Sequence, residues 1–97
     1  MREAMDYILD LEGNKIIIEA QQREMKQNLA DQYVRVRKEL KLTQEHVSKR
    51  SGIPRSNIAR FESGKYNPSL ELMVKMAAAM GMKVQIQLVP DEKEREA

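Results

Sequence analysis

The sequence predicts a small all-α domain in which two short helices meet at a tight turn, with a helical extension before the domain and one β-strand after it. Three observations support this prediction. Thr43 and Gly52 bracket a first short helix, and Pro54 begins a second one. Apolar residues on both sides of this pair recur every three or four positions, as on the buried face of a helix. After Gly81 the period changes to two, which is typical of a strand.

The N-terminal extension comprises residues 1–27. Within it, residues 1–12 place a stripe of apolar side chains on one helical face, which predicts a short amphipathic helix. Gly13 and Asn14 follow as a turn. The β-branched residues Ile16–Ile18 form either a strand or the start of the next helix, because so short a run has no decisive period.

Residues 21–41 have a helical composition throughout, with apolar residues stepping by three and four. They form one long helix or two helices joined near Asn28. The two short helices then cover residues 43–51 and 54–62. Ser69 caps a fourth helix, which ends at Gly81.

The predicted strand carries alternating apolar and polar residues and is stopped by Pro90. A lone strand leaves its backbone donors and acceptors without partners. We expect the same strand of a second copy to pair with it about a two-fold axis, and the run Ile16–Ile18 is the alternative partner. The segment 83–97 is thus a dimerisation strand with a charged tail, and the expected dimer residues are Val84, Gln85, Ile86, Gln87 and Leu88.

Composition excludes several classes of function. The 97 residues make one domain, and the absence of cysteine excludes disulfides, a cysteine nucleophile and a zinc finger. No run approaches the roughly 20 apolar residues of a membrane span, so we expect a soluble, cytoplasmic protein. The single histidine, His46, has no second ligand at a useful spacing, and no phosphate loop or activated nucleophile is present. The sequence predicts no enzyme, no metal and no cofactor.

Charge is unevenly distributed along the chain. Residues 33–66 contain nine basic and three acidic side chains, whereas residues 1–20 contain two basic and five acidic ones. Positive charge therefore coincides with the two short helices, as contact with DNA phosphates requires. A solvated helical face would have the same composition, but its coincidence with the helix pair favours nucleic-acid binding.

The chain resembles the Cro-like, XRE-type helix-turn-helix of phage repressors and bacterial regulators from about Leu29 to Met82. This resemblance implies a lambda-repressor-like bundle and a DNA-binding domain over residues 28–82. It rests on a set of residues at matched spacings, which is more specific than any one of them: Arg37, Leu42–Glu45, Val47, Gly52–Ile53, Ser56, Ile58, Phe61–Glu62, Gly64–Lys65, Asn67–Leu70 and Gly81.

The same resemblance implies roles for single residues. Arg55, Ser56 and Arg60 match the positions that face the major groove, where arginine is the commonest reader of guanine. Arg37 and Glu62 match a buried salt bridge between the first and third helices. The expected phosphate contacts surround the helix N-termini and the following loop: Thr43, Gln44, Asn57, Lys65, Tyr66 and Asn67.

Together, these residues predict a dimeric, sequence-specific regulator that binds a palindromic operator in double-stranded DNA. The strand-and-tail ending further resembles HigA-type antitoxins, which implies a RelE-like (HigB-type) endoribonuclease toxin as a partner. The acidic residues 1–20 would then meet that basic nuclease. The alternatives are a stand-alone dimeric repressor, a repressor that senses a small molecule and a helical interaction module that does not act on DNA.

Overall fold

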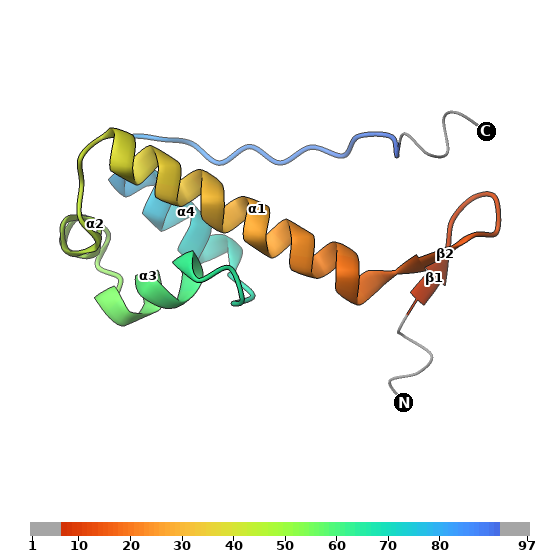
Figure 1. Cartoon of the computed structure of the whole chain (residues 1–97). Helices are drawn as coiled ribbons and strands as arrows, with labels where there is room; N and C mark the ends of the chain where they lie inside the picture. The colour runs from red at the N-terminus through yellow and green to blue at the C-terminus, as the bar shows by residue number, and fades with distance from the viewer. Residues whose placement is uncertain (1–6, 92–97) are drawn as a thin grey trace. The chain divides into compact units, whose positions relative to one another are not determined.

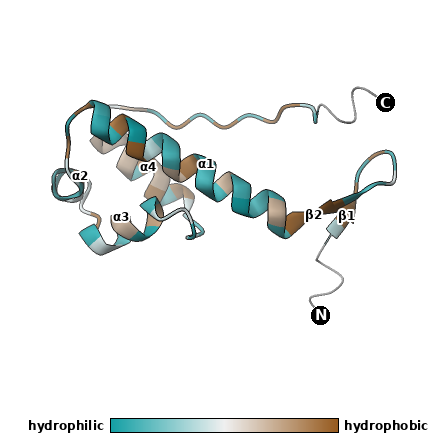
Figure 2. Ribbon diagram, viewed as in Figure 1, coloured by the Kyte–Doolittle hydropathy of each residue, from teal (hydrophilic) through white to brown (hydrophobic). Residues whose placement is uncertain are grey.

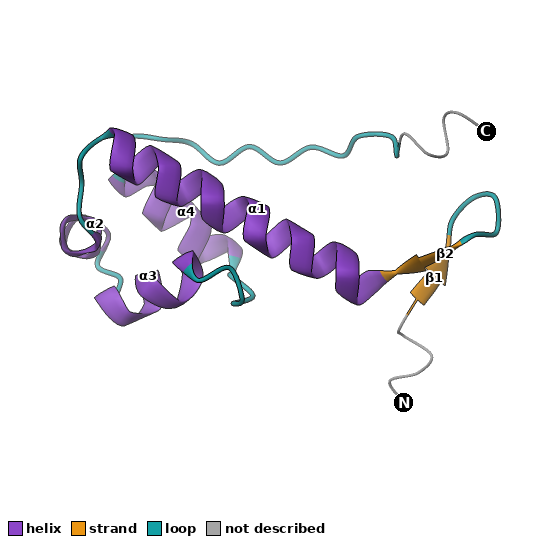
Figure 3. Cartoon of the chain, in the orientation of Figure 1, coloured by secondary structure: helices purple, strands orange, loops and turns teal. Residues whose placement is uncertain are grey.

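A computed structural model describes residues 7–91 of the chain (Figure 1). The described part contains two short strands followed by four helices, coloured by type in Figure 3. One compact unit, Arg23–Val84, holds the helical bundle, and the chain before and after it forms a second unit. The elements are β1 (Tyr7–Leu9), β2 (Lys15–Ile17), α1 (Ile18–Glu39), α2 (Gln44–Ser51), α3 (Arg55–Glu62) and α4 (Leu70–Ala79).

The bundle is built around an aliphatic, methionine-rich core, as the composition predicts. Tyr33 of α1 meets Phe61 of α3 edge to face, with ring centroids 4.9 Å apart. The Tyr33 hydroxyl donates a 2.9 Å hydrogen bond to the carbonyl of Met73 in α4. Tyr33 of α1 is therefore attached to both α3 and α4. Burial of the apolar side chains of the whole core is the main stabilising contribution. The predicted all-α bundle is confirmed.

Local signals fix the start and the end of α4 as predicted. The Ser69 hydroxyl accepts from the Leu72 N–H at the start of α4, and Gly81 has a positive φ of 72° after its end. Residues 21–39 belong to one continuous helix, so the alternative with a break near Asn28 is wrong. The second short helix begins at Arg55, one residue later than expected, with Pro54 as its N-cap.

The extension before α1 differs from the expected helix. Residues 7–9 form β1, which pairs antiparallel with β2, and Ile8 lies opposite Ile16. Asp10 closes the connecting loop, because its carboxylate accepts the N–H groups of Glu12 and Asn14. The run Ile16–Ile18 therefore contributes both a strand and the first residue of α1. The rest of the predicted helix, residues 1–6, lies outside the described residues.

The segment after α4 is not part of a sheet in the single chain. Among residues 7–91 the sheet contains β1 and β2 alone, so the intramolecular pairing of residues 84–88 with Ile16–Ile18 is wrong. Val84 is half-buried against the bundle core, whereas Ile86 and Leu88 are 65% and 99% exposed. Figure 2 shows hydrophobic residues along this segment and on β2. Pairing with a second copy stays a prediction.

Candidate nucleic-acid interface

The helix α3 presents a polar face to solvent because its apolar face is locked into the core. Ile58 and Phe61 are fully buried, while Arg55, Ser56 and Arg60 are exposed. These three side chains are the ones that the resemblance places toward the bases. A helix held this firmly on one side can present its other side in a fixed orientation.

The turn before α3 is held by its own hydrogen bonds. Gly52 ends α2 with φ 78°, and its N–H donates to the Ser48 carbonyl at 2.9 Å. The Ser48 hydroxyl donates to the carbonyl of Ile53 at 2.6 Å, and the buried Ile53 side chain anchors the turn. Glycine adopts this left-handed conformation without strain. The turn between α2 and α3 therefore depends on the glycine at position 52.

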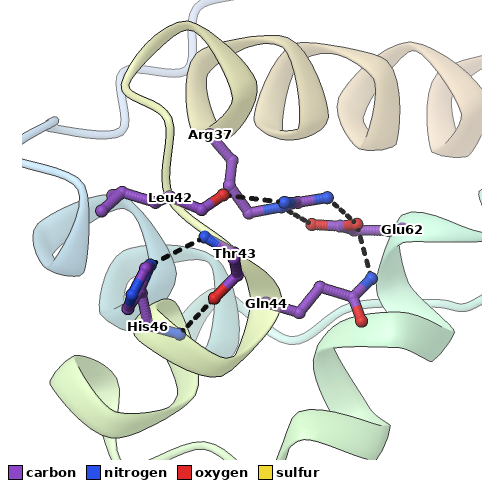
Figure 4. A network of polar contacts seen from close by, with 6 residues as sticks. All are labelled: Arg37, Leu42, Thr43, Gln44, His46 and Glu62. Atoms are coloured by element: carbon purple, nitrogen blue, oxygen red, sulfur yellow. Dashed lines mark hydrogen bonds and ion pairs between the residues drawn. The ribbon is translucent and has the colours of Figure 1, made fainter.

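A polar network ties α1, α2 and α3 together (Figure 4). The Arg37 guanidinium donates to both Glu62 carboxylate oxygens, at 2.7 and 2.9 Å, and to the Leu42 carbonyl at 2.9 Å. Gln44 adds a 2.9 Å hydrogen bond from its Nε2 to Glu62 Oε1. The implied Arg37–Glu62 salt bridge is present, and its bidentate geometry restrains the end of α3 in two directions.

This network changes the environment of one expected phosphate contact. Gln44 is half-buried and its amide nitrogen is engaged by Glu62, so the amide is oriented before any ligand arrives. Thr43 is exposed, and its hydroxyl caps α2 by accepting from the His46 N–H. His46 returns the interaction, because its Nδ1 accepts from the Thr43 N–H at 3.0 Å. The sequence analysis missed this capping box, in which histidine takes the place usual for Glu or Gln.

The loop after α3 supports Arg60. The Arg60 guanidinium lies over the Tyr66 ring, 5.5 Å from its centroid, and Tyr66 packs against the core. Tyr66 is therefore placed to hold Arg60, and its contact with a phosphate stays a prediction. Lys65 and Asn67 are exposed beside it, and Asn57 is half-buried on α3.

An open cleft of about 620 Å³ lies where α1 ends and α2 and α3 begin. Half of the residues that line it are basic, although Arg37 is neutralised by Glu62 and one carboxylate, Glu45, also takes part. Lys38 and Lys41 on its rim were counted in the basic segment but were not singled out by the sequence analysis. The full lining is Arg37, Lys38, Lys41, Leu42, Thr43, Gln44, Glu45 and Arg55.

Two groups away from this interface, Tyr33 and Glu71, have shifted pKa values. Burial raises the pKa of the Tyr33 phenol above its ordinary value. The Lys75 ammonium, 2.9 Å from Glu71, lowers the pKa of that fully exposed carboxyl. Within residues 7–91, no three His, Cys, Asp or Glu side chains group closely enough to hold a metal ion, and no helix has the length and apolarity of a membrane span.

Residues 35–86 match the family model described as Helix-turn-helix, which is more than half of the chain. An uncharacterized HTH-type transcriptional regulator of Archaeoglobus fulgidus is 41% identical over 58 residues, covering 60% of this chain and 82% of that protein. The immunity repressor protein of Bacillus phage phi105 is 41% identical over 49 residues, 50% of this chain and 34% of the repressor.

A solved structure is similar in fold as well. The restriction-modification controller protein C.AhdI from Aeromonas hydrophila has a TM-score of 0.59 and 27% sequence identity, over 62% of this chain and 91% of that one. The chain thus belongs to the helix-turn-helix family, and the predicted Cro-like resemblance is confirmed. The HigA-type resemblance stays a prediction.

Proposed function

We propose that this protein is a sequence-specific DNA-binding transcriptional regulator that reads base edges with α3. One observation carries the proposal: the buried Ile58 and Phe61 fix α3 so that Arg55, Ser56 and Arg60 share its exposed face. Arginine in the first turns of a recognition helix reaches guanine O6 and N7 in the major groove. Family membership and relatives named as transcriptional regulators support the same conclusion.

The test is a comparison of base readers with a phosphate contact. DNA selected from a random duplex library by the purified protein supplies the operator, and a scrambled duplex is the control. Arg55→Ala and Arg60→Ala should each weaken operator binding by about 1–3 kcal/mol and relax preference at one base pair per half-site. Lys65→Ala should weaken both duplexes alike and reduce the salt slope by about one unit per protomer. Unchanged discrimination after Arg55→Ala would contradict this use of α3.

We further propose that the regulator is a homodimer joined through its C-terminal segment. The exposed Ile86 and Leu88 alternate with Gln85 and Gln87, so an antiparallel copy would cover the apolar side chains and pair the backbone groups. Two copies related by a two-fold axis match the two half-sites of a palindromic operator.

Substituting proline at position 85 tests the dimer. Gln85→Pro removes a ladder donor and should shift the protein to monomer in sedimentation while the helical circular dichroism is retained. The control is Val74→Asp, which places a charge on an exposed apolar position of α4. If Val74→Asp dissociates the dimer and Gln85→Pro does not, the interface lies on α4 instead.

A toxin partner is a second candidate, favoured by the β1–β2 hairpin. Leu11 and Ile17 there are 93% and 51% exposed, and residues 1–20 carry a net negative charge. Exposed apolar side chains in an acidic segment suit a basic nuclease, because opposite charge steers association and apolar burial stabilises the complex. A RelE-like endoribonuclease is the candidate class, and the regulator would then be the antitoxin of a HigBA-type pair.

Co-expression with a small gene encoded beside this one, where the genome carries such a gene, tests this candidate. Full-length protein should restore growth and retain the nuclease on a column, whereas protein lacking residues 1–17 should do neither and still bind its operator. Ile17→Asp serves as a point variant that leaves the helical unit intact. A neighbour that is harmless alone, or that the full-length protein does not retain, leaves a stand-alone repressor.

A further inference from the structure

The connection between α1 and α2 contains an unusual backbone conformation at Lys41. Among the described residues other than glycine, Lys41 alone has a positive φ, at 60°. The N–H of Lys41 donates to the Lys38 carbonyl at 2.9 Å, and that of Leu42 donates to the Arg37 carbonyl at 3.0 Å. This pattern is a Schellman motif, whose left-handed position favours glycine because a Cβ there approaches the backbone.

The chain uses glycine at four other positive-φ positions, including Gly52 at the end of α2 and Gly81 after α4. With lysine at position 41, the folded protein is therefore less stable than it would be with glycine there. Strained backbone positions cluster at functional sites, which makes the Lys41 side chain a candidate for a role of its own. The Lys41 side chain lines the cleft at the start of α2.

The cleft has the charge of an anion site. Lys38, in the last turn of α1, and Lys41, just after that helix, line the cleft together with Arg55 of α3. Arg37 is held by Glu62, and Glu45 is the remaining carboxylate of the lining, so the basic groups exceed the free acidic one. Arg55 is also a proposed base reader. A duplex engaged by Arg55 thus brings its sugar-phosphate backbone toward Lys38 and Lys41, since the readers of the major groove lie between two phosphate strands.

We propose that Lys41, together with Lys38, binds a backbone phosphate of the operator in this cleft, and that the strained backbone at position 41 is retained for this contact. The inference rests on the proposed DNA-binding function. It adds a phosphate site at the end of α1 to the contacts expected from α2, α3 and the following loop. Because the contact is to phosphate, it supplies affinity and register without sequence preference.

Three substitutions separate the charge of Lys41 from its backbone. Lys41→Gly removes both the charge and the strain, and Lys41→Asn removes the charge while tolerating the left-handed conformation. Lys41→Arg keeps both. Lys75→Gln on α4 is the matched control, since it removes one positive charge from a residue that does not line this cleft.

The magnitude follows from counterion release. One phosphate contact contributes about 0.9 to the slope of log K against log salt. If the contact contributes nothing at about 1 M salt, its loss weakens binding about fifteenfold at 50 mM and about fivefold at 150 mM salt per protomer. We expect Lys41→Gly and Lys41→Asn to show these losses equally on selected and scrambled duplexes. Lys41→Arg and Lys75→Gln should keep wild-type affinity and slope. Lys41→Gly should also raise the melting temperature by about 3–5 °C, so its weaker binding is not a loss of fold.

Fluorescence anisotropy across a salt series, with the selected duplex and its scrambled control, decides between the outcomes. If Lys41→Gly and Lys41→Asn keep the wild-type slope while the wild-type protein still prefers its selected duplex, the phosphate site is refuted and the regulator stands. If the wild-type protein itself shows no preference between the duplexes, the proposed function fails first. A loss confined to the selected duplex would overturn the assignment of Lys41 to phosphate and make it a base reader.

Discussion

The network around Glu62 predicts that removing one charge is worse for the fold than removing both. In Arg37→Met the Glu62 carboxylate loses the bidentate guanidinium and keeps Gln44 as its donor. The Leu42 carbonyl loses its donor as well. The side chains of Arg37 and Glu62 are only 11% and 8% exposed, so water replaces the lost donors poorly.

The expected cost of Arg37→Met is about 3–5 kcal/mol, the range for breaking a buried ion pair from one side. A domain of this size is stable by about 5–15 kcal/mol, so the variant unfolds at a markedly lower temperature. The double variant Arg37→Met with Glu62→Met leaves no unpaired charge. Its cost should be about 1–2 kcal/mol, arising from the amide of Gln44 and the carbonyl of Leu42 that lose partners.

Urea unfolding followed by circular dichroism measures these free energies, and the four proteins form a double-mutant cycle. The double variant should be more stable than either single variant, because it leaves no unpaired buried charge. If Arg37→Met costs under about 1 kcal/mol, water screens the pair and the network is not a clamp on α3. If the double variant costs as much as the two single variants together, the residues act independently.

Three further predictions concern local stability. Thr43→Ala should lower the free energy of unfolding in urea by about 1 kcal/mol and His46→Ala by about 0.5 kcal/mol, because each removes one hydrogen bond of the capping box. Unchanged stability in both variants would contradict a stabilising role of the capping box. Gly52→Ala should cost about 1–2 kcal/mol because of the positive φ, with Gly52→Asn less affected. Burial raises the pKa of Tyr33 above 10.0, so its contribution to stability is full below pH 10 and lost as pH rises through the folded-state pKa. Tyr33→Phe should cost about 1 kcal/mol and reduce the alkaline decline in a pH series of melts.

The parts of the fold that were predicted correctly are those set by short-range signals. Thr43, Gly52 and Ser69 act on backbone groups within four residues of themselves, so their effect can be read without knowing the tertiary structure. The apolar period of α1 and α4 is likewise local. The buried residues Val47, Ile58 and Phe61 follow from these helices once the turn at Gly52 is in place.

The hairpin was missed because two local patterns compete over the same residues. Within residues 1–12, the apolar side chains are spaced as on one face of a helix, and this spacing predicts a helix. In the structure, the Asp10 carboxylate binds the backbone of Glu12 and Asn14 instead, and the loop turns back so that Tyr7 lies opposite Ile17. An aspartate that can bond to following N–H groups favours a turn over a helix, and that competition outweighs the apolar period.

For the candidate interface, residue types could be predicted but their connections could not. Gln44 was expected at a phosphate and is also bonded to Glu62, eighteen positions away. Tyr66 was expected at a phosphate and lies under the Arg60 guanidinium. Lys41 is left-handed because the Schellman hydrogen bonds end α1 there. Lysine has no preference for this conformation, so the sequence does not predict it. Such relations depend on how helices pack, and a single sequence carries no direct record of packing.

The structure separates the groups that hold α3 from the groups that α3 presents. Ile58 and Phe61 lie in the core and Glu62 is bound by Arg37, whereas Arg55 is exposed and has little to do with the fold. Substituting an exposed residue away from caps and core usually changes stability by under about 0.5 kcal/mol. Substitutions at Arg55 should therefore alter DNA preference at nearly constant stability, while loss of the Glu62 network should weaken binding to every sequence together with the fold. This division would let the sequence preference of the regulator change through its exposed residues without the bundle having to be rebuilt.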